Sequence, residues 1–383
     1  MSSCESTTIC VVGAGIIGLS IAWNLAAAGE TDILIIEKTG IGAEASGIQP
    51  GGVRQQWSTA INCELARESV LFYENINRHL EPLAPVRLER CGYVFIADSA
   101  DELRILGKSV ALQNKLGIKS VVLSPDELSV VVPGIIVHGM FGAAYYDRDG
   151  YFDRPQGVVE AFAAAAGRTG TTIVPGHVVD ISQHGERWKL KLFDGRAVIA
   201  SQVVLAGGYE LLPLAETLDL RLPVTKQPRY LFLSDPIRER LLEPLVVAPA
   251  RSFAAKHLAD GRVLASDLSA GVVAGADESD WRATVRSAIR ATLPVLKYVS
   301  FPILAEGFYD VTPDHQPIIG EVAGRPGLWL AVGFSGHGFM LAPAIGRRVA
   351  EAVVHGLDDV IFACFSRDRF DAANSLASET QIV

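Results

Sequence analysis

The chain has 383 residues, of which 49% are apolar and 20% charged, and its formal net charge at pH 7 is −9. This is enough material for two domains, or for one cofactor fold with a second domain inserted in it. The acidic balance and the scattered lysines and arginines argue against nucleic acid as a partner. No apolar run reaches the roughly 18 to 20 residues of a membrane span, and no charged, apolar leader precedes Ile9, so we expect a soluble, cytoplasmic protein.

The chain opens with a pattern typical of dinucleotide binding. Residues 9–12 form an apolar strand, residues 16–28 have helical spacing of apolar side chains, and a second buried strand over 32–36 ends at Glu37. The turn between the first strand and the helix contains Gly13, Gly15, Ile17 and Gly18. Glycines let the backbone approach a pyrophosphate at a helix N-terminus. An acidic residue about 20 positions after the glycines, as Glu37 is here, accepts hydrogen bonds from ribose hydroxyls. The pattern predicts FAD or NAD, and argues against the 2′-phosphate of NADP.

The middle of the chain alternates helical and strand patterns without repeating. A segment rich in Gly, Ser and Gln over 39–58 precedes a predicted helix over 59–80. An amphipathic helix is predicted over 100–116 and a small-residue helix over 156–168. Several strands follow in close succession between 172 and 205. The alternation favours a mixed fold of helices and strands.

The last part of the chain reads as strand, glycine loop and helix. The loop Gly333-Phe-Ser-Gly-His-Gly338 precedes a helix that we predict to begin near Ala342-Pro343, because proline is tolerated in the first helical turn. The amides of this loop, from Gly333 to Met340, and the helix N-terminus are expected to point at one ligand. Residues 374–383 are predicted to form a flexible tail.

Together these motifs resemble the FAD-dependent amine and amino-acid oxidoreductases of the D-amino-acid oxidase, glycine oxidase and sarcosine oxidase superfamily. The resemblance spans nearly the whole chain. It is carried by the opening motif with Glu37, the loop over 42–56, the strand ending at Gly207-Gly208, and the motifs that begin at Thr312 and Gly336. The motifs are nearest to those of sarcosine oxidases and of the beta-type subunits of heteromeric amino-acid dehydrogenases.

The resemblance implies an α/β fold, α+β overall, in which a Rossmann-like FAD-binding domain is interleaved with a substrate domain built on an antiparallel-rich sheet. The FAD-binding domain would comprise residues 1–88, 152–215 and 305–373, and the substrate domain residues 89–151 and 216–304. The implied FAD-binding residues are Gly13, Gly15, Ile17, Gly18, Glu37, Lys38, Ala45, Ser46, Gly51, Gly52, Val53, Val179, Ala206, Gly207, Gly336, His337, Gly338, Phe339 and Met340.

Relatives in this superfamily oxidise a carbon that bears an amino group by passing its hydride to flavin N5, and water hydrolyses the resulting imine. No side-chain base need remove that hydrogen. The resemblance implies oxidation of the C–N bond of a small amino acid or secondary amine, such as an imino acid or N-methyl amino acid. Oxygen or a redox partner would accept the electrons, and the protein could form homo- or hetero-oligomers. FAD would be noncovalent, because Gly307 stands about where part of the family carries the linking cysteine.

The stretch before Thr312 departs from the glycine oxidase pattern. It contains Tyr309 and Asp310 but no arginine, whose planar fork clamps the substrate carboxylate in relatives. Met340 likewise stands where some amine oxidases carry a carboxylate-binding lysine. The candidate substrate-binding residues are Arg54, Tyr309, Lys256 and Gly336, with Arg251 as a further candidate cation. The candidate catalytic residues are His337, Tyr309 and Arg54.

Two other interpretations stay open. A flavin-dependent 2-hydroxyacid dehydrogenase would use the same cofactor, but it needs a base such as His337 or His257 for the hydroxyl proton. The chain could instead be a flavin-holding subunit that depends on a partner with another redox centre. The cysteines at 4, 10, 63, 91 and 364 and the eight histidines show no metal-ligand spacing, so no metal site is predicted.

Overall fold

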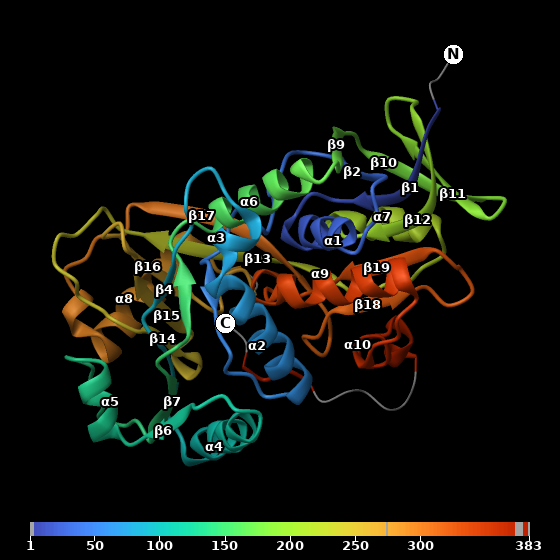
Figure 1. Cartoon of the computed structure of the whole chain (residues 1–383). Helices are drawn as coiled ribbons and strands as arrows, with labels where there is room; N and C mark the ends of the chain where they lie inside the picture. Colours follow the sequence, from blue (N-terminus) through green and yellow to red (C-terminus); the bar gives the residue numbers. More distant parts are fainter. Residues whose placement is uncertain (1–3, 273–274, 372–377, 382–383) are drawn as a thin grey trace.

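The computed structural model describes residues 4–272, 275–371 and 378–381 (Figure 1). Within these residues the strands form two eight-stranded sheets and one three-stranded sheet. Figure 1 shows the first large sheet on the right, beside the N-terminus, and the second on the left. The two large sheets therefore lie at opposite ends of the molecule.

The first sheet has a parallel core assembled from distant parts of the chain. Its strands, in spatial order, are β10 (Val178–His184), β11 (Arg187–Leu192), β12 (Ala197–Leu205), β1 (Cys4–Val12), β2 (Ile33–Glu37) and β9 (Thr172–Pro175), with β19 (Leu328–Val332) beside β12 and β18 (Ile318–Glu321) beside β19. The series β9, β2, β1, β12 and β19 is parallel. Parallel strands covered on both faces require continuous apolar runs, and all four residues from Ile33 to Ile36 are buried.

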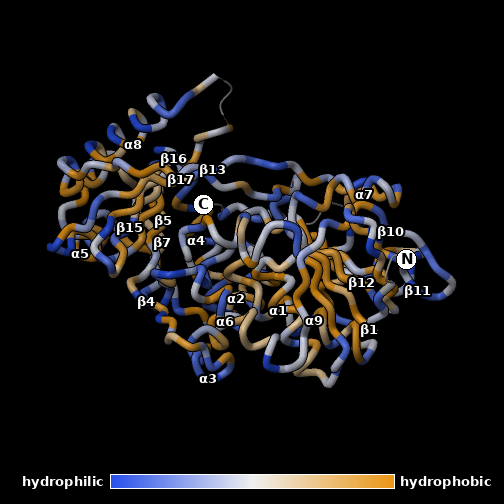
Figure 2. The backbone as a smooth tube through the Cα atoms, turned by 90° about the horizontal axis from the view of Figure 1, so that it is seen from above, coloured by the Kyte–Doolittle hydropathy of each residue, from blue (hydrophilic) through white to orange (hydrophobic). Residues whose placement is uncertain are grey.

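Two helices from opposite ends of the chain pack together on this sheet. The helices on this side are α1 (Ile16–Ala27), α2 (Ala60–Glu74), α6 (Pro155–Arg168) and α9 (Gly338–His355). Helix α9 approaches α1 so closely that a Cβ at Gly346 would lie 2.2 Å from Ser20 Oγ. Ser20 Oγ donates a hydrogen bond of 2.8 Å to the carbonyl of Ala342. Apolar residues run along β1, β12 and α9 (Figure 2), so this contact joins both ends of the chain in one core.

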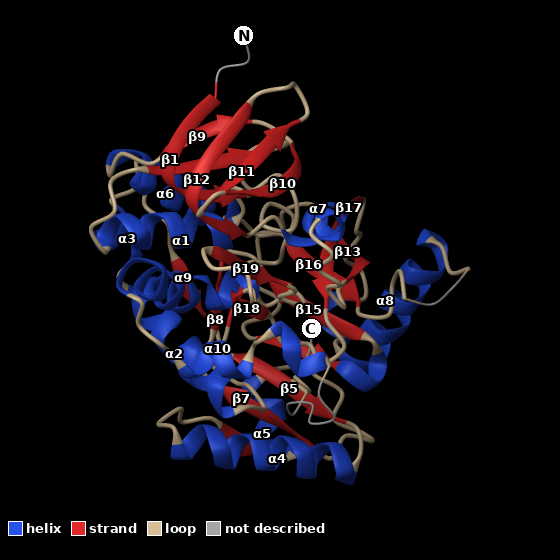
Figure 3. Ribbon diagram, turned by 90° about the vertical axis from the view of Figure 1, so that its right-hand side faces the viewer, coloured by secondary structure: helices blue, strands red, loops and turns tan. Residues whose placement is uncertain are grey.

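The second sheet is almost entirely antiparallel. Its strands, in spatial order, are β17 (Ile303–Val311), β13 (Thr225–Leu233), β16 (Val263–Asp267), β15 (Phe253–His257), β14 (Leu245–Ala248), β5 (Tyr93–Ala97), β7 (Gly142–Tyr146) and β6 (Val121–Leu123). Only the β14–β5 pair of these described strands is parallel. The neighbouring helices are α4 (Ala100–Lys115), α5 (Pro125–Val131) and α8 (Glu278–Thr292) (Figure 3). The predicted fold class is therefore confirmed.

A small sheet and several short helices complete the described structure. The three-stranded sheet consists of β3 (Gly52–Val53), β8 (Gly150–Phe152) and β4 (Leu88–Arg90). The remaining helices of the described residues are α3 (Ile76–Leu80), α7 (Leu212–Thr217) and α10 (Val360–Cys364), with 3-10 turns η1 (Gly208–Leu211), η2 (Pro249–Arg251), η3 (Pro294–Leu296) and η4 (Arg367–Phe370).

Two helix boundaries differ from those predicted. The helix expected over 59–80 divides into α2 and α3 at Asn75, whose backbone leaves helical geometry at φ −115° and ψ 15°. Helix α9 begins at Gly338, ahead of the predicted start, and contains Pro343 in its interior. The Tyr73 hydroxyl donates to the carbonyl of Phe339, which an amide at position 343 would otherwise bind. A hydroxyl from α2 thus compensates for the missing proline N–H.

Part of the predicted flexible tail is docked against the body of the protein. Glu379 is buried, and its carboxylate accepts hydrogen bonds from Ser58 N at 3.0 Å, Ser58 Oγ at 2.6 Å and Asn62 Nδ2 at 3.0 Å. These hydrogen bonds attach residues 378–381 to Ser58 and Asn62, and the flexibility of the tail stays a prediction. Residues 374–377, 382 and 383 lie outside the described residues.

Candidate active site

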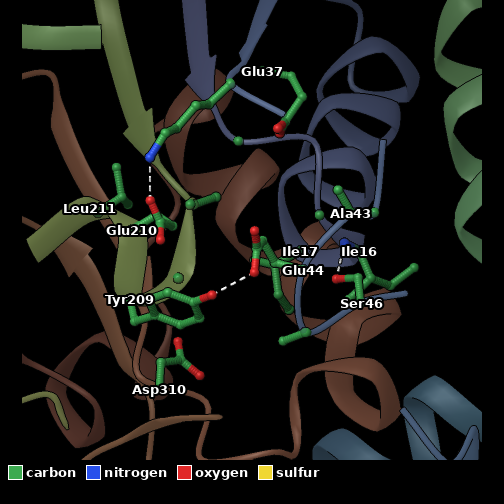
Figure 4. Close-up of a pocket in the computed structure, with 18 of the residues that line it drawn as sticks. Ile16, Ile17, Glu37, Ala43, Glu44, Ser46, Tyr209, Glu210, Leu211 and Asp310 are labelled. Atoms are coloured by element: carbon green, nitrogen blue, oxygen red, sulfur yellow. Dashed lines mark hydrogen bonds and ion pairs between the residues drawn. The ribbon is translucent and has the colours of Figure 1, made fainter. Parts of the chain in front are cut away.

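A pocket opens beside the carboxyl ends of β1 and β2. It contains about 1230 Å³ of space free of atoms, part of which is open to solvent. The lining comes from five separate stretches of the chain, within 12–49, 176–178, 206–214, 309–310 and 331–339. Figure 4 shows Glu37 at one end of the drawn pocket and Asp310 at the other. The two ends of the sequence therefore meet at one site.

The glycine turn after β1 has no room for side chains. Gly13 has φ 109°, and a Cβ there would lie 2.8 Å from the carbonyl oxygen of Ala206. A Cβ at Gly18 would lie 2.1 Å from the carbonyl oxygen of Gly13. Ser46 Oγ accepts a hydrogen bond of 2.9 Å from Ile16 N, which ties the following loop to the first turn of α1. The arrangement presents a helix N-terminus and bare backbone to the pocket, as a pyrophosphate requires.

Glu37 is held by backbone amides at the end of β2. One carboxylate oxygen accepts from Ala14 N at 2.6 Å, and the other accepts from Thr39 N at 2.7 Å and Gly40 N at 3.1 Å. The first oxygen has a single partner among the described residues and so keeps the capacity to accept another donor. A ribose hydroxyl at this end of the pocket fits that capacity.

Two side-chain bridges lie among the pocket residues, one toward Glu37 and the other nearer Asp310 (Figure 4). Lys38 forms an ion pair with Glu210, and the Tyr209 hydroxyl donates to the carboxylate of Glu44. Sequence reasoning missed Glu44, Tyr209 and Glu210. No spacing signal links residues so far apart, although the position of Tyr209 directly after Gly207-Gly208 could have drawn attention to it.

The glycine loop before α9 is organised by Asp310, which sequence reasoning also missed. Asp310 Oδ2 accepts from Gly333 N at 2.7 Å, and its backbone carbonyl accepts from Ser335 N at 3.0 Å. Burial raises the pKa of Asp310 to about 6, against the opposing effect of these amides. The expectation that all loop amides face a ligand is thus corrected, because the first ones bind Asp310. A Cβ at Gly336 would lie 2.3 Å from the Tyr309 ring, so this position requires glycine.

The predicted cofactor residues divide into two groups. Those that line the pocket are Gly13, Gly15, Ile17, Glu37, Lys38, Ala45, Ser46, Ala206, Gly207, Gly336, Gly338 and Phe339. Those outside its lining are Gly18, Gly51, Gly52, Val53, Val179, His337 and Met340. Val178 lines the pocket beside the predicted Val179. Gly51 and Gly52 are closely packed by other residues. A Cβ at Gly51 would lie 2.3 Å from Phe152 O, and a Cβ at Gly52 would lie 2.1 Å from Tyr93 Oη.

A second group of residues, which we term the Arg54 cluster, is polar and buried. Its members are Arg54, Gln56, Asp149, His337, Glu379 and Gln381. The Arg54 guanidinium donates to the carbonyls of Gln56 and Gln381 and lies 3.9 Å from the centroid of the Trp57 ring. Arg54 Nε has no hydrogen-bond partner among the described residues, and neither does either polar side-chain atom of Gln381.

His337 connects the Arg54 cluster to the glycine loop. Its ring packs edge-on against Trp57 at 4.7 Å between centroids, and it is the N-cap residue of α9. Burial, followed by the charge of Arg54, lowers the pKa of His337 well below its ordinary value, so the ring is neutral near pH 7. Its Nε2 has no partner among the described residues. Burial also raises the pKa of Asp149 to about 7.

The other predicted cations have structural partners. Lys256 is 1% exposed, donates to the carbonyl of Pro50, lies 4.0 Å from the centroid of the Tyr151 ring and does not line the pocket. Burial lowers the pKa of Lys256 to about 7. Arg251 is paired with Asp98 at 2.7 Å. Neither cation is placed at the pocket wall.

The pocket residues fit a flavin dinucleotide. A pyrophosphate matches the glycine turn and the start of α1, and a ribose matches Glu37. The far end is lined by Tyr309 and Gly336, which pack closely against each other. None of the residues that line the pocket is a cysteine. In the described part of the chain no group of His, Cys, Asp and Glu side chains is placed to hold a metal ion, and no helix is both long and apolar enough for a membrane span.

Comparisons with known proteins show the family to which the chain belongs. The profile of the FAD dependent oxidoreductase family (DAO) matches residues 8–352. The chain is 27% identical over 401 residues to FAD-dependent oxidoreductase domain-containing protein 1 of Bos taurus, covering 92% of this chain and 82% of that protein. It is 29% identical over 364 residues to 4-methylaminobutanoate oxidase (formaldehyde-forming) of Paenarthrobacter nicotinovorans, covering 90% of this chain but only 43% of that protein.

The fold has a solved counterpart. The crystal structure of L-proline dehydrogenase from P. horikoshii matches with a TM-score of 0.89 at 23% sequence identity, over 98% of this chain and all of that one. At this identity the match establishes the architecture alone. The resemblance inferred from the sequence motifs is confirmed by the family match.

Proposed function

Because the chain belongs to the family of FAD dependent oxidoreductases, we propose that it is an enzyme for the C–N bond of a small amino acid or secondary amine. An imino acid or an N-methyl amino acid is the favoured substrate class. The relative from Paenarthrobacter nicotinovorans, whose name specifies an N-methylated amino acid, supports that class. The chain covers less than half of that relative, so the likeness concerns only the portion that the two share.

The observation that carries this proposal is the buried guanidinium of Arg54 beside His337. Arg54 is fully buried, only carbonyl oxygens accept its hydrogen bonds among the described residues, and its Nε has no partner there. A buried cation with a free donor is suited to a carboxylate. Arg54 and His337 lie outside the pocket lining, but Gly336 and Gly338, on either side of His337, line it. Both Arg54 and His337 contact the Trp57 ring, so the cation lies close behind this loop. In this proposal Arg54 orients the substrate by its carboxylate.

FAD, when bound, supplies the two-electron acceptor for the hydride of the carbon that carries the nitrogen. Tyr309 lines the pocket against Gly336 and limits where the substrate carbon can lie. The neutral His337 adds no positive charge near the amine, which must be uncharged to release a hydride. Orientation, rather than a catalytic base, is therefore the main contribution of these side chains.

The hydroxyacid alternative finds less support in the histidines. Both ring nitrogens of His257 are engaged with the backbone, with Leu241 N at 3.0 Å and with Gly261 O at 2.9 Å. His337 has a pKa well below its ordinary value because of burial, so it is a weak acceptor for a hydroxyl proton at neutral pH. An amine substrate needs no such acceptor.

Anaerobic bleaching of the bound flavin tests the proposal. Proline, hydroxyproline, sarcosine, glycine and D-amino acids are compared with lactate as a hydroxy acid. We expect at least one amino or imino acid to bleach the flavin, and Arg54→Gln to lower kcat/KM for it by about 100-fold. Bleaching by lactate alone contradicts the proposal. Reoxidation by oxygen, or only by a dye, then distinguishes an oxidase from a subunit that needs a redox partner.

A further inference from the structure

Arg229 lies on β13, on the side of the second sheet that faces the cofactor pocket. In the antiparallel register Arg229 pairs with Gly307, and Gln227 pairs with Tyr309. Residues two apart on a strand share a face, so Arg229 and Tyr309 are on the same face. Tyr309 lines the pocket, and a Cβ at Gly307 would meet Ile48 of the cofactor loop at 3.0 Å. The side chain of Arg229 therefore approaches the pocket from the second sheet.

No carboxylate among the described residues pairs with Arg229. Its guanidinium donates to the carbonyl of Pro228 at 2.9 Å and to Gln227 Oε1 at 3.0 Å, and lies 5.0 Å from the centroid of the Tyr309 ring. Two other partly buried arginines have carboxylate partners. Arg348 pairs with Glu68 and Asp359, and Arg251 pairs with Asp98. Arg229 thus differs from them in having its donors directed to neutral oxygens.

Arg54 and Arg229 approach a pair of histidines from different segments. The charge of Arg54 contributes to the low pKa of His337, after burial. The charge of Arg229 contributes to the low pKa of His315, after burial and beside the opposing charge of Asp314. His315 in turn acts on His337. Atoms Nδ1 of His315 and Nε2 of His337 are buried without partners among the described residues. Arg229 is linked to Arg54 through the contact of Tyr309 with Gly336 and the contact of His337 with Trp57. Glu379 supplies a negative charge that acts on both Arg54 and His315.

We propose that the substrate carries two anionic groups, one bound by Arg54 and the other by Arg229. This inference rests on the proposed function and narrows it to dicarboxylic amino acids or dicarboxylic secondary amines. A monocarboxylic substrate bound by Arg54 would leave the Arg229 guanidinium with neutral acceptors alone. A second carboxylate gives Arg229 a charge-assisted partner at the pocket side of β13. The Tyr309 ring, whose centroid lies 5.0 Å from the Arg229 guanidinium carbon, gives this cation a favourable neighbour at that position.

Matched substrates test the proposal with the flavin-loaded, full-length protein. N-Methylaspartate and N-methylglutamate are compared with N-methylalanine in anaerobic flavin reduction, each as both enantiomers. We expect a dicarboxylate to have the higher kcat/KM by at least about tenfold. Arg229→Gln should lower its kcat/KM by about 100-fold and change that of N-methylalanine by less than about threefold. Arg229→Lys should recover part of the loss, and Arg290→Gln, at an exposed position on α8, is the control.

A binding measurement keeps this inference separate from the proposed reaction. Succinate and propionate differ by one carboxylate and have no amine to oxidise. We expect succinate to raise Tm more than propionate in the wild-type holoprotein, and the difference to vanish in Arg229→Gln. Equal effects of the two acids, or an unchanged succinate effect in the variant, overturn the proposal. Flavin reduction by monocarboxylic amines with no dicarboxylate preference also overturns it, while the proposed function stands.

Discussion

The cofactor pocket and the Arg54 cluster adjoin at the glycine loop, where Gly336 and Gly338 line the pocket and His337 belongs to the cluster, but the two are built differently. The pocket near β1 is shaped by backbone, with glycines where a Cβ at Gly13 or Gly18 would collide with carbonyl oxygens. The Arg54 cluster is shaped by buried polar side chains whose partners come from residues 54–62, 149, 337 and 379–381. Backbone geometry leaves a local signature in the sequence, whereas a side-chain network depends on which segments the fold brings together.

The largest expected effect is a loss of FAD affinity on substitution in the glycine turn of the cofactor pocket. Gly13→Ala places a methyl group 2.8 Å from Ala206 O at φ 109°, so FAD affinity should fall by at least about 100-fold. Gly29→Ala is the matched control, because Gly29 has a similar φ of 103° but no atom within 4 Å of a Cβ. The control should lose about 1 kcal/mol of stability and retain FAD. Equilibrium dialysis of FAD and thermal unfolding measure the two quantities, and equal FAD affinities would refute the account.

Removal of Glu379 tests the side-chain network. Glu379→Ala leaves Ser58 and Asn62 with unpaired donors in a buried site and should lower the free energy of unfolding by about 2–3 kcal/mol. Thr380→Ala, at the exposed neighbouring residue, should change it by less than about 0.5 kcal/mol. Denaturant unfolding of both variants provides the comparison. Equal stabilities would mean that residues 378–381 contribute little to the fold.

Lys256 provides a titratable contrast to Arg54, which stays charged. Burial lowers the folded pKa of Lys256 to about 7 from 10.5, so the unfolded chain binds more protons between these values. Its contribution to stability therefore increases as pH rises from about 7 to about 10.5, by up to about 1.4 kcal/mol per pH unit. Lys256→Met should remove this rise, as seen in Tm measured against pH. A variant whose Tm follows the wild-type pH dependence would contradict the assignment.

The smallest expected effect is a change in the rate of FAD release when the hydrogen bond between Tyr209 and Glu44 is removed. Tyr209→Phe removes the hydroxyl that donates to Glu44, so FAD release should become about two- to fivefold faster. Tyr298→Phe, at a residue that is 89% exposed, is the control. The recovery of free flavin fluorescence after dilution measures the release rate. Slower release from Tyr209→Phe would show that the bridge opposes binding.

The glycine turn, the acid at Glu37 and the parallel apolar strands were predictable because each depends on neighbours in the sequence. A strand, a tight turn and a helix within some thirty residues carry their own periodicity and their own steric demands. The same local logic failed at Pro343, since a hydroxyl from Tyr73 lets α9 continue through the proline. It also assigned to a ligand the loop amides that Asp310 binds.

What the sequence alone determined is the cofactor class and the order of the elements that form its pocket. The tertiary structure decided which lysine and arginine side chains lie near the pocket and which are paired elsewhere. From the sequence, Lys256 and Arg251 were candidate substrate-binding cations just as Arg54 was. In the structure Lys256 donates to the carbonyl of Pro50 and Arg251 pairs with Asp98. The register of β13 and β17 instead brings Arg229 beside Tyr309. Burial and charge pairing depend on distances between segments far apart in the chain, and residue type and spacing do not encode those distances.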